Sequence, residues 1–188
     1  MKGRIFLRTA VIIAGLLAGT CAFAQKQLPK KVLIVYYSWS GNTRQLANTI
    51  AKHINADILE LQPEIPYPTD YGECVRQVKG EAQNKFRPKL KNLPADINGY
   101  ETIIIGSPIW WHTMAPPVLT FLSAFDFSGK TVLPFYSHGG SGGGTYAKDV
   151  KQACRNGRVT DVYGVRGTGG SSMENAIMQW LNKYGIAK

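Results

Sequence analysis

Hydroxyl side chains are concentrated between an apolar run and the start of an expected helix. Residues 32–36 are apolar enough for a buried strand, and Ser38, Ser40 and Thr43 follow directly. Backbone N–H groups at a helix start lack partners within the helix, and the helix dipole adds partial positive charge there. Hydroxyl donors beside such amides indicate a phosphate-binding site. The alternative is an ordinary loop in which Ser or Asn caps the helix.

This segment resembles the first loop of the flavodoxins. It reads Ser-Trp-Ser-Gly-Asn-Thr, and the flavodoxin loop reads Ser/Thr-x-Thr-Gly-x-Thr and wraps the terminal phosphate of flavin mononucleotide (FMN). Serine at the middle threonine keeps the hydroxyl donor. The resemblance implies that the cofactor is FMN and that its phosphate is bound by Ser38, Trp39, Ser40, Gly41, Asn42 and Thr43.

A tryptophan-rich segment follows the next expected buried strand, at 102–106. The corresponding flavodoxin loop flanks the flavin ring, and a tryptophan offers a large apolar face suited to stacking on it. The alternative is that both tryptophans pack within their own fold or form a patch for a partner. The resemblance assigns to the flavin Pro108, Ile109, Trp110, Trp111 and His112.

A glycine-rich segment, 137–144, follows an expected strand at 131–136. Glycine allows close backbone approach, so the loop can offer amides to the ring edge or the ribityl chain. Flavodoxins usually place a second stacking tyrosine here, which this loop lacks. Either Tyr136 or His138 takes that place, or this flavin face is open to a substrate or partner. The candidate ligands are Ser137, His138, Gly139, Gly140 and Gly143.

Two histidines of these segments have two possible roles each. His112 and His138 could donate a hydrogen bond or a proton near reduced flavin, because histidine titrates near neutral pH. Either could equally cap a loop. Elsewhere the sequence has no convincing metal-ligand cluster, and no metal is expected.

Strands and helices are expected to alternate, which is typical of a parallel sheet covered by helices on both faces. The expected strands are 32–36, 57–61, 102–106, 131–136 and 159–165, and the expected helices are 42–53, 70–85, 114–125, 145–154 and 172–184. Five strands fit an α/β, flavodoxin-like, five-stranded parallel sheet, which binds ligands beyond the carboxyl ends of its strands. The resemblance covers about residues 31–185.

The N-terminal residues read as a secretory signal peptide. Basic residues at 2, 4 and 8 precede an apolar stretch at 10–18, and Ala22-Phe23-Ala24 is typical of a cleavage site. We expect removal of residues 1–24 and a flavodoxin-like FMN-binding domain at 25–188. A retained anchor, or lipoprotein processing at Cys21, is the weaker alternative. The mature protein is expected to be exported, most simply to the periplasm, with secretion as the alternative, and to have no stable membrane span.

Charge and cysteine content set further expectations. The formal net charge is +10, and loss of three basic residues with the signal peptide leaves a basic protein of about +7. Such a protein favours anionic surfaces, anionic substrates or acidic partners, whereas no nucleic-acid-binding motif accompanies the charge. Cys74 and Cys154 would remain, but their places in the chain argue against a disulfide.

Three functional hypotheses follow. The favoured one is an exported FMN protein that transfers electrons to or from a redox partner protein or a small-molecule acceptor, with the flavin supplying the chemistry. The second is a quinone or flavin reductase that uses NADH or NADPH at an open flavin face. The third is a non-redox exported binding module that kept the fold and lost the flavin.

Overall fold

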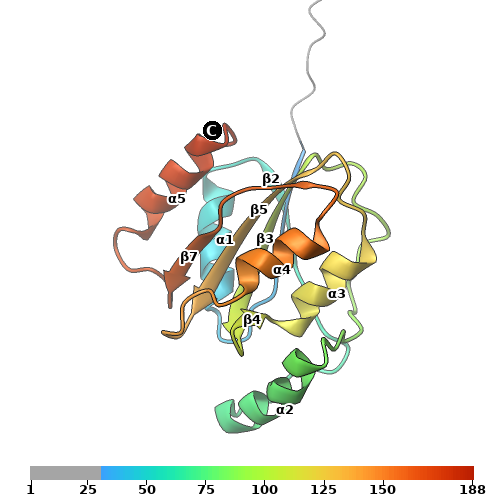
Figure 1. Cartoon of the computed structure of the whole chain (residues 1–188). Coiled ribbons are helices and arrows are strands. Elements are labelled where there is room, and N and C mark those ends of the chain that lie inside the picture. The colour runs from blue at the N-terminus through green and yellow to red at the C-terminus, as the bar shows by residue number, and fades with distance from the viewer. Residues whose placement is uncertain (1–30) are drawn as a thin grey trace, which may run out of the picture.

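The computed structural model describes residues 31–188, so the expected signal peptide lies outside the described residues. The described chain forms one parallel sheet with a short antiparallel addition (Figure 1). The main strands run in the order β2-β1-β3-β5, which is the flavodoxin-like order with its reversal of direction between β1 and β3. Their bounds are β1 Val32–Tyr36, β2 Ala56–Glu60, β3 Thr102–Trp110 and β5 Thr131–His138.

The sheet has seven strands, where the sequence predicted five. The expected fifth strand is two short strands, β6 (Arg158–Val159) and β7 (Tyr163–Arg166), both paired with β5. The break lies opposite Pro134. The Val132 carbonyl accepts from the Thr160 amide, so the backbone groups of Val132 face the edge of β5 that pairs with β6 and β7. The backbone groups of alternate residues face the same edge, so the Pro134 nitrogen faces it too. Proline has no N–H to donate, and the ladder is interrupted.

The segment predicted as a loop after the third strand is a β-hairpin. Strand β3 continues to Trp110 and turns back as β4 (Thr113–Met114), with Ile109 opposite Met114. Trp111 and His112 form the two-residue turn, with φ of 48° and 65°. Helix α3 (Pro116–Ala124) therefore begins two residues later than predicted, and its first turn contains the proline pair, as expected.

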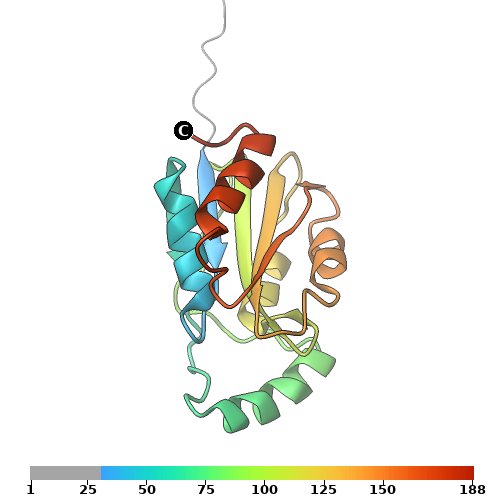
Figure 2. The same ribbon diagram turned by 90° about the vertical axis from the view of Figure 1, so that its left-hand side faces the viewer.

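Two helical layers cover the two faces of the sheet (Figure 2). Helices α1 (Asn42–Lys52) and α5 (Met173–Lys183) lie on one face, and α3 and α4 (Tyr146–Ala153) lie on the other. Strand β1 serves both cores: Ile34 packs with the α1 and α5 side, and Val35 packs with the α3 and α4 side. All five β1 residues are buried, as expected for a central parallel strand.

Helix α2 (Tyr71–Gln83) lies away from both layers, at the carboxyl edge of the sheet (Figures 1 and 2). It begins at Asp70, whose side chain accepts a hydrogen bond from the Glu73 amide at 2.8 Å. Only Cys74 and Val78 of this helix are buried. Helix α2 therefore forms a wall at the edge where β1, β3 and β5 end.

The described residues contain two buried free thiols, Cys74 on α2 and Cys154 after α4. Within 31–188, no helix is both long and apolar enough to cross a membrane. In the same range, no group of three or more His, Cys, Asp and Glu side chains is placed to hold a metal ion.

Candidate functional site

The loops after β1, β3 and β5 meet at the carboxyl edge of the sheet. The hydroxyl oxygens of Thr43 and Ser137 are 2.8 Å apart and hydrogen-bonded, which joins the first loop to the third. Both side chains are buried. Pro108 pairs with Ser137 in the sheet register, which brings the second segment to the same point. The three segments selected from the sequence therefore surround one site.

Replacing Thr43 with Val is expected to destabilise the protein by about 1–3 kcal/mol, because it leaves the buried Ser137 hydroxyl without its partner. Thr43→Ser keeps the hydroxyl and is the matched control. Urea denaturation of both variants measures the difference. Equal unfolding free energies for the two variants would show that this hydrogen bond does not hold the loops together.

The start of helix α1 has no side-chain cap. Gly41 precedes it in the left-handed region, at φ 91°, and its amide donates to the Ser38 hydroxyl at 3.2 Å. The first helical backbone bond runs from the Gln45 amide to the Gly41 carbonyl at 3.0 Å. The amides of residues 42–44 therefore precede the helical ladder, and the first turn carries no acidic residue. This end of α1 can bind an anion.

A cleft of about 630 Å³ opens beside the start of α1. Its size falls within the range of small-molecule sites, and its walls are mostly apolar and aromatic. None of the described residues that line it is Asp or Glu. It is bounded by three sets of residues: Trp39, Ser40 and Asn42; Pro108, Ile109, Trp110, Trp111 and His112; and Ser137, His138, Gly139, Gly140 and Ser141. Helix α2 closes the fourth side.

Three tryptophans reach this cleft from different directions. Trp110 packs edge-on against Tyr37 and Tyr67, with ring centroids 5.5 and 5.0 Å away. Trp39 donates its indole N–H to the Pro68 carbonyl at 2.9 Å. Trp111 is 45% exposed and donates its indole N–H to the Val75 carbonyl of α2 at 3.2 Å. Each ring is held by a neighbouring element, so the aromatic walls are in place before any ligand arrives.

The third loop is organised by His138. Its Nδ1 atom accepts hydrogen bonds from the amides of Gly140 and Gly142, at 3.1 and 2.9 Å. An Nδ1 that accepts leaves the proton of the neutral ring on Nε2. The loop-capping role considered for this histidine is therefore present in the structure, and the ring also lines the cleft.

Tyr136 and Gly143 lie outside the cleft. A Cβ on Gly143 would lie 2.7 Å from the Tyr136 ring, so the glycine allows the loop to pass over this ring. Tyr136 packs edge-on against Tyr146, with centroids 5.7 Å apart. Of the two side chains considered for the second stacking position, only His138 lines the cleft.

The Trp111–His112 turn is clamped by the start of α4. The His112 carbonyl accepts from the Thr145 amide at 2.7 Å and from its hydroxyl at 3.2 Å. A Cβ on Gly144 would lie 2.0 Å from the same carbonyl oxygen, so only glycine fits there. Left-handed backbone at two non-glycine residues costs about 1–2 kcal/mol each. The clamp holds this costly turn and thereby fixes Trp111.

Comparison with known proteins agrees with this architecture. The profile of the flavodoxin family matches residues 31–184. The chain belongs to the flavodoxin family. None of the proteins with curated functions matches its sequence.

Solved structures of other flavoproteins superpose on this flavodoxin-family chain. A protein from Bacteroides eggerthii whose crystal structure has been assigned to the flavoproteins is 27% identical, with a TM-score of 0.72 over 81% of this chain and 96% of that one. A Lactobacillus acidophilus flavoprotein, solved in complex with FMN, is 26% identical, with a TM-score of 0.64 over 80% and 98%. Oxidised flavodoxin 2 of Bacillus cereus, at 18% identity and a TM-score of 0.51 over 81% and 99%, shares the fold.

Sequence reasoning missed the α2 wall of the flavodoxin-family cleft. Its lining residues are Tyr71, Cys74, Val75 and Val78. They follow the i, i+3, i+4, i+7 spacing of a single helical face. This narrow apolar stripe was the signal in the sequence, because a helix with so narrow an apolar face covers little of a sheet and is free to line a cleft instead.

Buried tyrosines behind the cleft make the fold sensitive to alkali. Burial, followed by the neighbouring Glu60 carboxylate, raises the pKa of Tyr36 to about 12. Burial also raises the pKa of Tyr37, and it raises the pKa of Tyr67 together with a 2.6 Å hydrogen bond to Glu81. The folded state therefore binds these protons more tightly than the unfolded state does, so this contribution is complete below pH ~10 and declines as pH rises through about 12.

We therefore expect alkaline unfolding to coincide with the ionisation of these three buried tyrosines. A pH titration that follows tyrosinate absorbance and near-ultraviolet circular dichroism together measures this. Ionisation of every tyrosine at its ordinary pKa of about 10, with the circular dichroism unchanged, is the result that would oppose it.

Proposed function

We propose that this flavodoxin-family protein binds FMN in the cleft and works as an exported electron-transfer protein. The observation that carries the proposal is the uncapped start of α1, which opens directly into an aromatic cleft lined by no carboxylate of residues 31–188. FMN, when bound, supplies redox chemistry that amino-acid side chains lack. The Lactobacillus acidophilus relative solved with FMN supports the choice of cofactor.

Each of the three loops would contact a different part of the cofactor. The amides of residues 42–44 and the Ser40 hydroxyl would hold the phosphate, because they combine free donors with the positive end of the α1 dipole. Trp110 and Trp111 offer faces for the flavin ring. The glycine loop, held in shape by His138, would present its amides to the remaining polar edge.

A redox-partner assay separates this proposal from the reductase alternative. An electron carrier is expected to be reduced by a chemical reductant or a donor protein, and to oxidise NADH or NADPH only at background rate with a quinone present. Steady turnover of either nicotinamide with the quinone would favour the reductase. Anaerobic reduction with dithionite is the control that the bound flavin is redox-active.

The charge around the cleft predicts a higher reduction potential than acidic electron-carrier flavodoxins have. No described lining residue is an Asp or Glu, and the chain is strongly basic. Positive surroundings favour the anionic reduced flavin over the neutral oxidised form. Redox titration at low and high salt measures the effect, which should shrink with salt because the outer charges are screened. A potential at or below that of acidic flavodoxins would contradict it.

The export part of the proposal rests on the N-terminal sequence alone. Fractionation of expressing cells, followed by mass spectrometry, is expected to give an extracytoplasmic protein that begins at Gln25. A cytoplasmic protein with intact residues 1–24 would overturn export and leave the cofactor proposal untouched.

A further inference from the structure

A second cleft lies behind the Trp111–His112 turn. It has a volume of about 550 Å³, and Trp111 and His112 line both clefts. Its apolar floor is made by Met114, Pro116 and Leu119, from the hairpin and α3. The end of α2, the segment that follows it and one side of α4 form the walls. The turn is thus a partition between two cavities of similar size.

The walls of this second cleft carry three cations: Lys79, Lys85 and Arg87. None of them has a carboxylate within 4.0 Å among residues 31–188. Arg87 is positioned by its Nε atom, which donates to the Ser123 hydroxyl at 2.8 Å and leaves both terminal nitrogens available. Lys79 lies 5.4 Å from the Trp111 ring centroid, in cation–π range.

Two carboxylates also line the second cleft, but both have donors already. Glu81 accepts from the Tyr67 hydroxyl at 2.6 Å and from Gln77 at 2.8 Å. Asp149 accepts from the hydroxyls of Thr113 and Thr145, at 2.6 and 2.5 Å. These neutral donors orient the two carboxylates but leave their charge, so the three cations of the lining exceed its two carboxylates by one.

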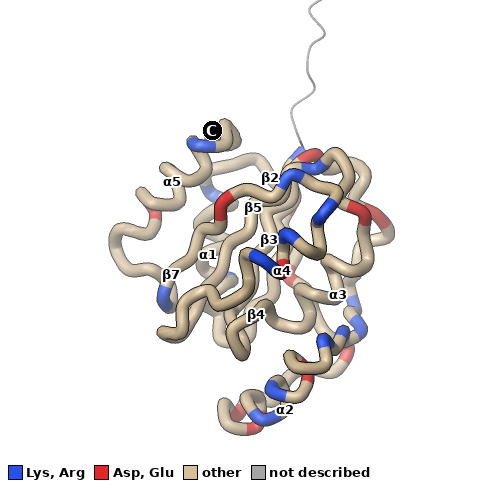
Figure 3. Tube along the Cα trace, viewed as in Figure 1, with Lys and Arg blue, Asp and Glu red and all other residues tan. Residues whose placement is uncertain are grey.

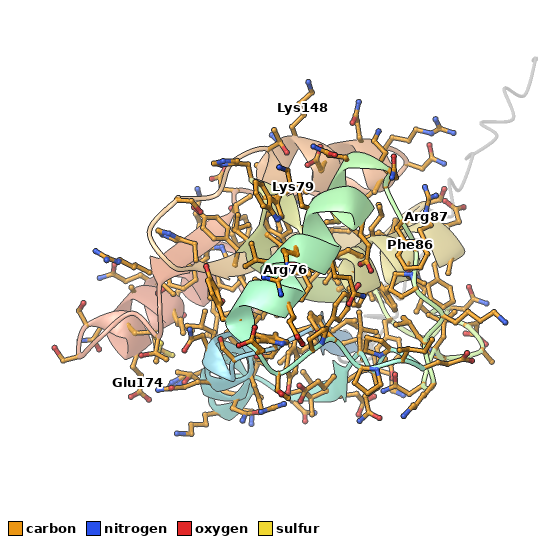
Figure 4. The ribbon with its side chains drawn as sticks, turned by 90° about the horizontal axis from the view of Figure 1, so that it is seen from below. Arg76, Lys79, Phe86, Arg87, Lys148 and Glu174 are labelled. Carbon is orange, nitrogen blue, oxygen red and sulfur yellow. The ribbon has the colours of Figure 1, made fainter. Side chains whose placement is uncertain are left out.

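Two aromatic rings of this cleft are unusually exposed. Trp111 and Phe86 are 45% and 48% exposed. Figure 4 looks onto α2 and labels Lys79 on the helix, Phe86 and Arg87 in the segment after it, and Lys148 on α4. Figure 3 shows Lys and Arg recurring along α2 and α4. Large exposed apolar side chains in a concavity are typical of a binding site.

We propose that the second cleft binds a planar aromatic anion. The aromatic rings and the apolar floor would contact its ring system, and Lys79, Lys85 and Arg87 would neutralise its charge. A sulfonated or carboxylated quinone has this chemistry. The assignment of this cleft as the site of a small-molecule electron acceptor rests on the proposed function. Its assignment as a binding site for an aromatic anion does not.

Isothermal titration with anthraquinone sulfonate tests the proposal, first without FMN and then with FMN at saturation. We expect one site in both titrations, and weaker binding of the neutral hydroxymethyl anthraquinone. Arg87→Gln and Phe86→Ala should each weaken sulfonate binding about fivefold or more, and Lys79→Gln should also weaken it. Lys148→Gln removes an equal charge from α4 outside the lining and should leave binding unchanged.

The other outcomes would overturn either the inference or the proposed function, and they can be told apart. Loss of sulfonate binding when FMN is added would place the probe in the first cleft. Equal binding by the Arg87→Gln and Lys148→Gln proteins, or equal affinity for the neutral and anionic probes, would show that these cations do not select the ligand. Failure to bind FMN, with sulfonate binding still weakened in Arg87→Gln, would overturn the proposed function and leave the second site standing.

Discussion

Replacing Asn42 with Asp is expected to stabilise the FMN-free protein and to weaken FMN binding at least tenfold. Asn42 is the first residue of α1, whose first turn has no acidic residue. A carboxylate there interacts favourably with the helix dipole, by about 0.3–1 kcal/mol. The same carboxylate would lie where the phosphate dianion binds. A tenfold loss of FMN affinity corresponds to about 1.4 kcal/mol, which the repulsion between two neighbouring negative charges readily supplies.

The two readouts of Asn42→Asp have opposite signs, which separates anion binding from damage to the fold. Asn48→Asp makes the same chemical change at an exposed position farther along α1 and should leave FMN affinity within about twofold. Thermal unfolding and flavin fluorescence measure the two effects. Unchanged FMN affinity in Asn42→Asp would mean that the phosphate does not bind at this helix start.

Replacing Gly106 with Ala is expected to destabilise the protein by about 2–3 kcal/mol, because the new methyl group cannot fit. Gly106 lies directly beside Phe135 in the β3–β5 register. A Cβ built there would lie 2.1 Å from the Phe135 ring, which is fully buried and has no room to move. The glycine therefore leaves room for the Phe135 ring just before β3 and β5 deliver their segments to the cleft.

A double-mutant cycle checks this cause. Phe135→Leu shortens the opposing side chain, so the loss in the Gly106→Ala, Phe135→Leu double variant should be smaller than the sum of the two single losses. Gly80→Ala, on α2 with nothing within 4 Å of the new Cβ, is the control and should be neutral or stabilising. Urea unfolding gives the free energies of the four variants and of the unsubstituted protein. A small loss in Gly106→Ala, with strict additivity in the cycle, would argue against the clash.

The sequence predicted the parts of this protein that depend on local patterns. An apolar run, a turn of hydroxyl residues and a helix at 42–53 are all readable from residue order, and the structure places α1 at Asn42–Lys52. The hairpin was not readable, since Pro108 normally ends a strand. The Gly106 carbonyl accepts from the Tyr37 amide, so the backbone groups of Gly106 face β1. The Pro108 nitrogen, two residues later, faces the same side. Strand β1 ends before Pro108, so no ladder bond is lost.

The position of α2 and the presence of the second cleft could not be predicted from the sequence either. The helix itself was expected at 70–85 and is found at Tyr71–Gln83. Its position across the carboxyl edge depends on contacts made far away in the chain, such as the Trp111 indole with the Val75 carbonyl. The strained turn that presents Trp111 is stabilised by Thr145 of another element. Contacts between residues so far apart in the chain produce no recognisable pattern of residue spacing in the sequence.

Titration of the purified protein with FMN, followed by flavin fluorescence and the visible spectrum, measures whether the cleft binds the cofactor. We expect saturable binding of one FMN per chain, with strong quenching because Trp110 and Trp111 line the cleft. We also expect Asn42→Asp to shift the titration to higher FMN concentration. Unquenched fluorescence and an unchanged spectrum throughout the titration would contradict FMN binding and favour a binding module that has kept the flavodoxin fold without its flavin.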